Sequence, residues 1–413
     1  MPVDFARVPP RVAVPESPQP SVVVWALLFV VIMGAGAALT ITSWPAGKPL
    51  DAFFWLCCVA YATFLWAFLL CLYLGHGHLR CRQTIADNAA SDKIDVECHA
   101  EASVPLAVLG HGWCFAGDEK EDDVDGIVSG ATQLGLRSSG AEPGTDVQAR
   151  WLEIPGKPLP PGNAQTEFVR QQVITDWLLG RLVERISAGL LLLPAGCSLH
   201  VHLSLQALCE VEEVRLGLAK LISATTPALR VTTTVSANEM PLSEADVWHD
   251  GLAAHDAHLL LAVRLRPAIS QRLEDGVAEA GVALLVTRPE LARSASPLMA
   301  PLFLHRPAID SLENAGQAAH LAVRWGKAAA PQAQAIWAHA LTEGAVRQIK
   351  GVSAFDPHAP WFDIDAAVGD CASAGAWLAT VLAIEYASRT ESPQIVVSQN
   401  DDHIVALVCR KQV

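Results

Sequence analysis

The stretch VGDCASAG, residues 368–375, carries the residues best placed for chemistry. Cys371 stands where a tight loop turns into a helix that we predict over residues 373–389. The N-terminus of a helix lowers the pKa of a thiol, and the thiolate is the nucleophilic form. Asp370 precedes it directly. The pattern therefore offers a thiol nucleophile, although a cysteine among small residues that pack a helix onto a sheet has the same composition.

Cys114 is the second candidate nucleophile. It lies in GHGWCFAG, residues 110–117, after a strand predicted over residues 104–110. Glycines after a strand can bind phosphate, but neither the dinucleotide fingerprint nor the P-loop pattern is complete, so we expect a glycine turn here. His358 and His403 are the candidate histidines for activating Cys371, which only the fold could bring close.

Soft metal ligands gather at His76, His78 and Cys81. These residues follow the second of two apolar segments, where a histidine also suits the boundary between lipid and water. We therefore predict neither a bound metal nor a cofactor.

Two uncharged apolar segments, residues 22–44 and 52–75, precede all of these groups. Each exceeds the roughly 20 residues that a helix needs to cross a bilayer, and only a helix satisfies its own backbone in lipid. A cleaved signal peptide would have a shorter apolar core, of about 7–15 residues. We predict a transmembrane helical hairpin over residues 21–75.

The flanking charges predict the orientation of this hairpin. Arg7 and Arg11 precede the first span. Arg80 and Arg82 follow the second, and the connecting turn holds only Lys48. Positively charged flanks stay in the cytoplasm, so we predict a two-pass protein of the bacterial inner membrane with both termini cytoplasmic.

Composition narrows the classes of partner. The net charge of −14 and the absence of a basic stripe argue against nucleic acid. The ten cysteines show no disulfide framework, as expected in a reducing compartment. The predicted organisation is a disordered proline-rich tail (1–20), the hairpin (21–75), a polar juxtamembrane stalk (76–103) and a cytosolic α/β domain (104–413).

Strand-like and helix-like patterns alternate through that domain. Strands are predicted at 198–205, 229–236, 257–265 and 281–287, and helices at 163–186, 312–326 and 331–349. The chain ends in a hairpin around Asn400. Such alternation predicts a mixed sheet with helices on both faces. The strand pairs at 257–287 and 394–410 further suggest two similar halves, each ending in paired strands.

The segment AVGDCASAGAWLATVLAIEYA resembles the C-terminal loop and helix of thiolase-like condensing enzymes, the ketoacyl synthases among them. Residues 281–307 are similar to a strand and the segment after it in the same family. The resemblance implies a doubled α/β fold whose halves each end in paired strands, in agreement with the repeat.

The departures from that family bear on activity. Gly369 matches its glycine, but Asp370 stands where the family has a histidine. The family's nucleophilic cysteine, at the start of a buried helix, has no counterpart, since Cys197 leads into a strand. The resemblance therefore implies a degenerate thiolase-like domain whose catalytic roles do not transfer to these positions.

The overall layout also resembles accessory proteins of bacterial type VI secretion, with a VDFARVPPR-like tail, two spans and a cytosolic α/β domain. We therefore predict a non-catalytic membrane-anchored protein that binds protein partners for effector delivery. Its predicted docking residues are Trp151, Phe168 and Trp177. Expected partners are secretion machinery, an effector, a thiolase-like protein or a second copy of the chain, together with membrane lipid.

One alternative remains open. A membrane-bound acyl-transfer or lipid-modifying enzyme would use Cys371 or Cys114 as its nucleophile.

Overall fold

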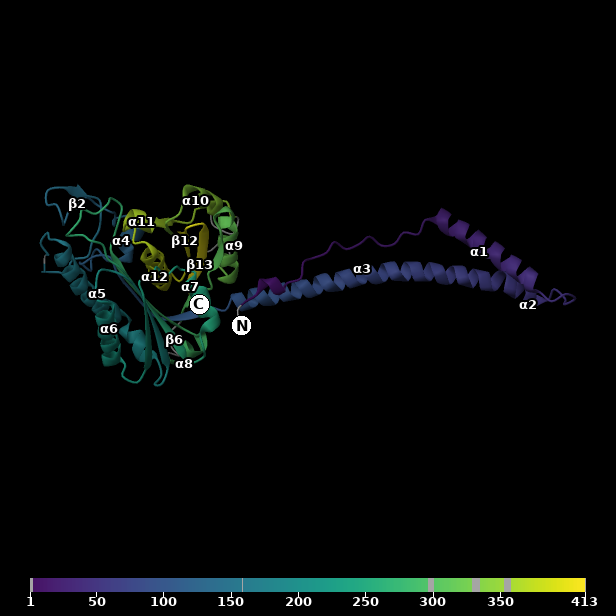
Figure 1. The fold of residues 1–413 in the computed structure, drawn as a ribbon, viewed down its shortest axis with the longest axis horizontal. Coiled ribbons are helices and arrows are strands. Elements are labelled where there is room, and N and C mark those ends of the chain that lie inside the picture. The colour runs from purple at the N-terminus through teal and green to yellow at the C-terminus, as the bar shows by residue number, and fades with distance from the viewer. Residues whose placement is uncertain (1–2, 158, 296–300, 329–334, 353–357, 413) are drawn as a thin grey trace. The chain divides into compact units, whose positions relative to one another are not determined.

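The computed structural model describes residues 3–157, 159–295, 301–328, 335–352 and 358–412. The chain divides into two compact units (Figure 1). One spans Asp4–His99, and the other spans Ala100–Val413 together with Met1–Val3. We describe each unit by itself.

The first unit contains the predicted hairpin. Helix α1 (Val22–Ser43) is followed by α2 (Ala52–Trp55), the π-turn η2 (Leu56–Ala60) and α3 (Tyr61–Ala102). Val22–Ser43 and the continuous helix Ala52–Ala102 are both long and apolar enough to cross a membrane. The indole of Trp66 donates to the carbonyl of Trp25 at 2.9 Å, which joins the two helices. The residues predicted as a polar stalk continue α3.

The proline-rich tail lies extended along α3. The Asn88 side chain donates to the Val12 carbonyl at 2.8 Å and accepts from the Val12 amide at 3.0 Å. Arg11 forms an ion pair with Asp92 at 2.6 Å. An extended proline-rich backbone makes no internal hydrogen bonds, so polar side chains of the helix can bind it.

A large sheet forms the centre of the second unit. Within the described residues it has 11 strands in the order β11-β10-β12-β13-β8-β1-β7-β6-β4-β5, with β9 pairing β13. The strands are β1 (Leu106–Cys114), β4 (Ser198–Gln206), β5 (Arg230–Ser236), β6 (Asp256–Arg264), β7 (Ala280–Thr287), β8 (Leu302–Leu304), β9 (Ala308–Ser311), β10 (Ala335–His339), β11 (Trp361–Asp363), β12 (Gln394–Asn400) and β13 (His403–Lys411). A separate short ribbon pairs β2 (Arg137–Ser138) with β3 (Asp146–Val147).

The sheet consists of two halves with the same topology. Across the sheet, the strands of the first half lie in the order β5, β4, β6, β7, β1. Numbered by their sequence order within this half, these are the third, second, fourth, fifth and first strands. The second half repeats it as β11, β10, β12, β13, β8. Each half ends in an antiparallel pair, β6 with β7 and β12 with β13. Antiparallel pairing of β1 with β8 joins the halves. The predicted doubling is confirmed.

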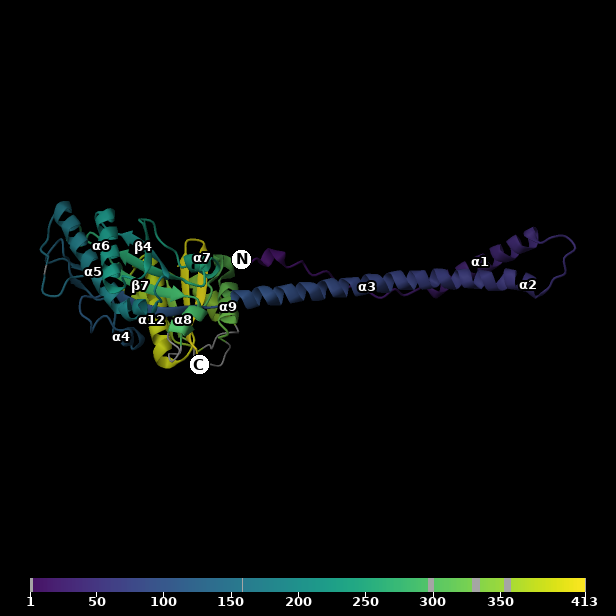
Figure 2. The ribbon, with the colours of Figure 1, turned by 90° about the horizontal axis from the view of Figure 1, so that it is seen from below.

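Helices cover both halves and fill the space between them. The helices are α4 (Val124–Val128), α5 (Ala164–Leu192), α6 (Val211–Thr225), α7 (Glu244–Gly251), α8 (Pro289–Ala295), α9 (Ala315–Trp325), α10 (Glu343–Lys350), α11 (Ile364–Ala367) and α12 (Ser373–Thr390). Helices α5 and α6 lie side by side on the first half (Figures 1 and 2), while α9 and α10 pack on the second. Helices α7 and α12 share one core with strands of both halves. A helix buried on all sides needs an apolar surface all round, and α12 has one.

Two sequence predictions were wrong here. The helix predicted over 331–349 is replaced by β10 and α10, and residues 331–334 lie outside the described residues. The glycine turn predicted at 110–117 is mostly strand, because β1 continues to Cys114. A Cβ at Gly112 would press on the Arg185 side chain, so this glycine lets α5 lie close to β1.

Candidate functional site

Both candidate thiols are sealed in the core. Cys371 and Cys114 have 0% exposure. The Cys114 thiol donates to the Ala116 carbonyl at 3.3 Å, and burial raises its pKa to about 12. Burial raises the pKa of Cys371 as well, with Asp365 and Asp370 adding to the effect. A thiol with a raised pKa is a poor nucleophile at neutral pH.

The predicted activation of Cys371 by a helix N-terminus is outweighed by burial. Cys371 does precede α12, as the sequence indicated, with Ala372 as the N-cap. The strongest charged influences on this thiol are Asp365, Asp370, Arg266 and Arg150. His403 lies exposed at the start of β13.

The imidazole that lies beside the first turn of α12 belongs to His339. His339 ends β10, Asp365 lies in α11, and Asp370 lies just before α12. One ligand atom from each falls within 4.8 Å of the others, and it is the one such group of three found among the described residues. We call these three residues the His339 cluster.

His339 is held firmly within the cluster. Its side chain is only 5% exposed, and Nδ1 lies 3.1 Å from the Ser398 hydroxyl. Gly375, in the first turn of α12, leaves room for the ring, because a Cβ there would overlap Nε2. Nε2 lies 3.6 Å from Oδ1 of Asp365, too far for a hydrogen bond.

Asp365 and Asp370 are held by the backbone. Asp365 Oδ2 accepts from the Ala340 amide at 2.6 Å, and burial raises the pKa of this carboxyl. Asp370 Oδ1 accepts from the Ala372 amide at 2.7 Å. Ala340 and Ala372 both adopt positive φ, at 54° and 49°. Such strain in residues with a Cβ is typical of functional sites.

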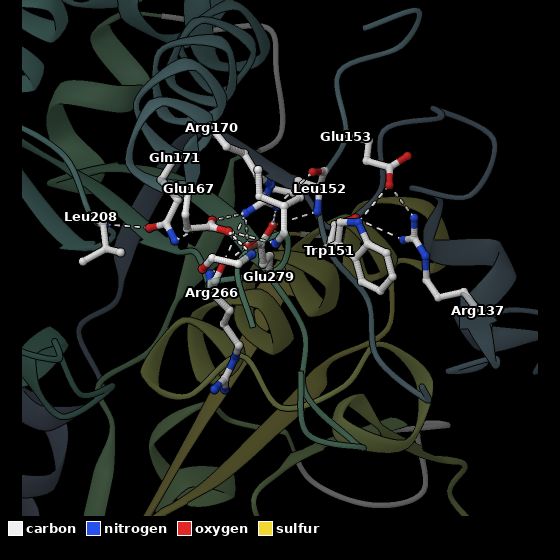
Figure 3. Close-up of polar contacts among 12 residues, drawn as sticks. Arg137, Trp151, Leu152, Glu153, Glu167, Arg170, Gln171, Leu208, Arg266 and Glu279 are labelled. Atoms are coloured by element: carbon white, nitrogen blue, oxygen red, sulfur yellow. Dashed lines mark hydrogen bonds and ion pairs between the residues drawn. The ribbon is translucent and has the colours of Figure 1, made fainter. Parts of the chain in front are cut away.

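A buried ion network fixes the loop that contacts Asp370 (Figure 3). Arg170 Nη2 lies 2.6 Å from Glu279 and Nη1 lies 2.9 Å from Glu167, and none of the three side chains is more than 1% exposed. Glu279 also accepts from the amide of Arg266 at 2.7 Å. The Arg266 guanidinium in turn donates to the Asp370 carboxylate at 3.1 Å. The network therefore positions one side of the His339 cluster.

The other candidate metal ligands do not converge. His76 and His78 are exposed on α3, and Cys81 donates to the Pro15 carbonyl at 3.1 Å. Residues two apart on a helix point to different sides, which separates the two imidazoles.

The predicted docking residues lie in or beside α5. Trp151 is 5% exposed, with the Arg137 guanidinium 3.4 Å from its ring centre (Figure 3). Phe168 and Trp177 are half-buried. Trp151 lines a groove of about 1220 Å³ together with Leu136, Arg137, Arg150, Glu153 and Arg181. We call this feature the Arg137 groove.

Comparisons with known proteins concern the fold. No protein-family model and no curated protein matches the sequence. A chain in the complex of a type II polyketide synthase acyl-carrier protein with its ketosynthase (AntDE:AntF) matches with a TM-score of 0.50 and 10% identity, covering 75% of this chain and 100% of its own.

Two further structures with this architecture show lower TM-scores. The ishigamide ketosynthase/chain length factor matches with a TM-score of 0.45 and 15% identity, covering 75% of this chain and 100% of its own. OleA of Xanthomonas campestris bound to cerulenin matches at 0.43 and 10%, covering 74% and 96%. The match with a TM-score of 0.50 shows that the α/β unit has the thiolase-like fold implied by the sequence resemblance.

His339 is the site residue that sequence reasoning missed. It lies in AIWAH, within a stretch predicted as helix, so no strand end was expected there. A histidine that ends a buried parallel strand would have been the useful signal, because such ends gather at one edge of a sheet.

Proposed function

We propose that this chain is a membrane-anchored adaptor whose thiolase-like unit binds a protein partner and does not use a thiol nucleophile. The observation that carries this proposal is the complete burial of Cys114 and Cys371. In addition, the first half's counterpart of α12 is α7, which begins after Pro241, Leu242 and Ser243 without a cysteine. Because the unit lacks an accessible thiol nucleophile, we infer that its surface carries the function by binding a partner.

The Arg137 groove is the proposed docking surface. Arg137 stacks on Trp151 and pairs with Glu153 at 2.7 Å, and Arg181 lies over Trp177. Stacked arginines and tryptophans are the side chains that most often dominate binding energy at interfaces. Leu136, 73% exposed, adds an apolar contact at the edge. The sequence layout favours a type VI effector or spike component as the partner.

A pull-down of the full-length protein in detergent tests this proposal. We expect the unmodified chain to recover a secretion component or effector, and Leu136→Asp to lose it. Leu208→Asp, a change at a leucine 53% exposed that does not line the groove, is the matched control and should retain the partner. Equal recovery by both variants, or repeated recovery of no such protein, would refute the docking surface.

Acyl transfer is the second candidate function. The similar structures are named as ketosynthases and OleA, which favours this candidate over the adaptor. At low identity, however, a shared fold does not imply shared chemistry. The specific observation in its favour is the His339 cluster, which combines an imidazole and carboxylates beside the start of α12. Turnover of an acyl thioester, lost on His339→Asn and kept on His320→Asn at an exposed histidine, would establish it.

We also propose that the hairpin spans the bacterial inner membrane with both termini cytoplasmic. The two apolar helices and the arginines that flank them support this topology. In intact cells, Gly47→Cys in the connecting turn should react with a thiol reagent that cannot cross the inner membrane, whereas Gly344→Cys at the start of α10 should react only after lysis. The reverse pattern would invert the topology.

A further inference from the structure

In the His339 cluster two buried polar atoms face each other without forming a hydrogen bond. Nε2 of His339 and Oδ1 of Asp365 are both buried, and neither has a hydrogen-bond partner within the described part of the chain. They lie 3.6 Å apart. If the Nδ1 proton is donated to Ser398, as the 3.1 Å contact allows, Nε2 presents a lone pair to a carboxylate oxygen. Two such atoms repel unless a cation lies between them.

The geometry points to a divalent transition-metal site formed by His339, Asp365 and Asp370. Bonds of about 2.0–2.2 Å to nitrogen and oxygen in a tetrahedral site place ligand atoms roughly 3.3–3.6 Å apart. The separation of 3.6 Å between His339 and Asp365 fits that spacing. Asp370 closes the group within 4.8 Å. This site goes beyond the proposed adaptor function.

The residues around the cluster support a metal in the way that outer-shell groups do. Metal-bound histidines usually hydrogen-bond through their second nitrogen, and His339 does so to Ser398, which is 3% exposed. The backbone amides of Ala340 and Ala372 orient one oxygen of each carboxylate. Two carboxylates balance the charge of the ion, and Arg266 holds Asp370 in place at 3.1 Å.

The donor set and its exposure indicate the class of ion. One imidazole with two carboxylates suits zinc or manganese better than calcium or copper(I). Asp370 is 55% exposed, so the site opens to solvent on that side. Three protein ligands and an open position leave room for water, in contrast to the closed four-ligand structural sites.

Calorimetric titration of the metal-free full-length protein with Zn²⁺ in detergent tests this inference. We expect one Zn²⁺ per chain. His339→Asn removes Nε2 but keeps a nitrogen near Ser398, and Asp370→Asn changes a side chain that is 55% exposed. Because outer-shell changes alone weaken metal binding by about 10–100-fold, each ligand change should weaken it at least about 10-fold.

The chain offers a matched control in a second histidine group. His202 Nε2 lies 2.7 Å from His258 Nδ1 on neighbouring strands, which makes this pair the alternative location for a single Zn²⁺. His202→Asn should leave the affinity unchanged. The inference is overturned if the unmodified chain binds no Zn²⁺, or if binding is lost in His202→Asn and retained in both cluster variants.

Discussion

At the residue scale, the buried guanidinium of Arg170 is required for the stability of the fold. It is 1% exposed and lies between Glu167 and Glu279, which are both fully buried. Removing one partner of a buried ion network leaves uncompensated charge. Here it would leave two carboxylates, since backbone amides satisfy only part of their hydrogen-bonding capacity.

We therefore predict that Arg170→Met lowers the free energy of unfolding by about 3–5 kcal/mol. Arg215→Met is the matched control, because Arg215 pairs with Glu212 at the surface of α6 and should change stability by less than about 0.5 kcal/mol. Denaturant unfolding of the three proteins measures the difference. Similar losses in both variants would show that the network contributes no more than a surface pair.

Glu385 should give stability a specific dependence on pH. Its hydrogen bond with His111 at 2.9 Å, with help from Arg389 at 2.7 Å, lowers its pKa from 4.5 to about 2 although partial burial opposes the shift. A carboxyl with a lowered pKa stabilises the folded state above its unfolded pKa, and this contribution is lost as the pH falls from about 4.5 toward 2.

Glu385→Gln should thus lower stability at pH 7 by about 1 kcal/mol, a value reduced for solvent screening of a half-buried pair. The difference from the unmodified protein should narrow at pH 3, as unfolding midpoints at the two pH values would reveal. Glu290→Gln, at a carboxylate 71% exposed, should show no such narrowing. A pH-independent difference would contradict the assigned pKa shift.

At the scale of elements, the close contact between α5 and β1 depends on glycines, and Gly189 is the one that lies in the helix. A Cβ at Gly189 would overlap the carbonyl of Leu109, whereas a Cβ at Gly180 in the same helix would meet nothing within 4 Å. Alanine also favours a helix over glycine by up to about 1 kcal/mol. Alanine substitutions at the two glycines therefore distinguish the effect of packing on stability from the effect of helix propensity.

We predict that Gly189→Ala destabilises the fold by about 1–3 kcal/mol through overpacking, and that Gly180→Ala stabilises it by up to about 1 kcal/mol. Thermal unfolding of both variants measures the signs. Stabilisation by both would mean that α5 does not approach β1 this closely.

Elements differ in how well the sequence predicts them. The strands β6 and β7 are nearly continuous apolar runs, as buried central strands require, and β4 alternates apolar with polar residues. The predicted bounds of all three agree with the structure within a residue. The strand β10 is short and lies in an alanine-rich stretch with high helix propensity. Its pairing with β11 and β12 outweighs that propensity, and no local pattern shows such pairing. For the same reason His339 was not expected to meet Asp365 and Asp370.

At the scale of the whole chain, the repeat of paired strands predicted the doubled architecture correctly. Two uncharged segments likewise predicted the two helices that are able to span a membrane. The burial of the two thiols could not be predicted from the sequence. A cysteine before a helix is activated by the helix if it is accessible and inert if it is buried, and the tertiary packing determines which of the two applies. Type VI secretion, the partner and a possible homodimer remain predictions.

The central claim, that this thiolase-like unit works without a thiol nucleophile, is tested most directly by acylation of the native full-length protein. With an acyl-thioester probe at pH 8 followed by mass spectrometry, we predict no adduct on Cys114 or Cys371, since both thiols are fully buried and burial raises the pKa of each. Alkylation of the half-buried Cys81 would verify that thiols are reduced. An acyl adduct on Cys371 that disappears in Cys371→Ala would contradict the account.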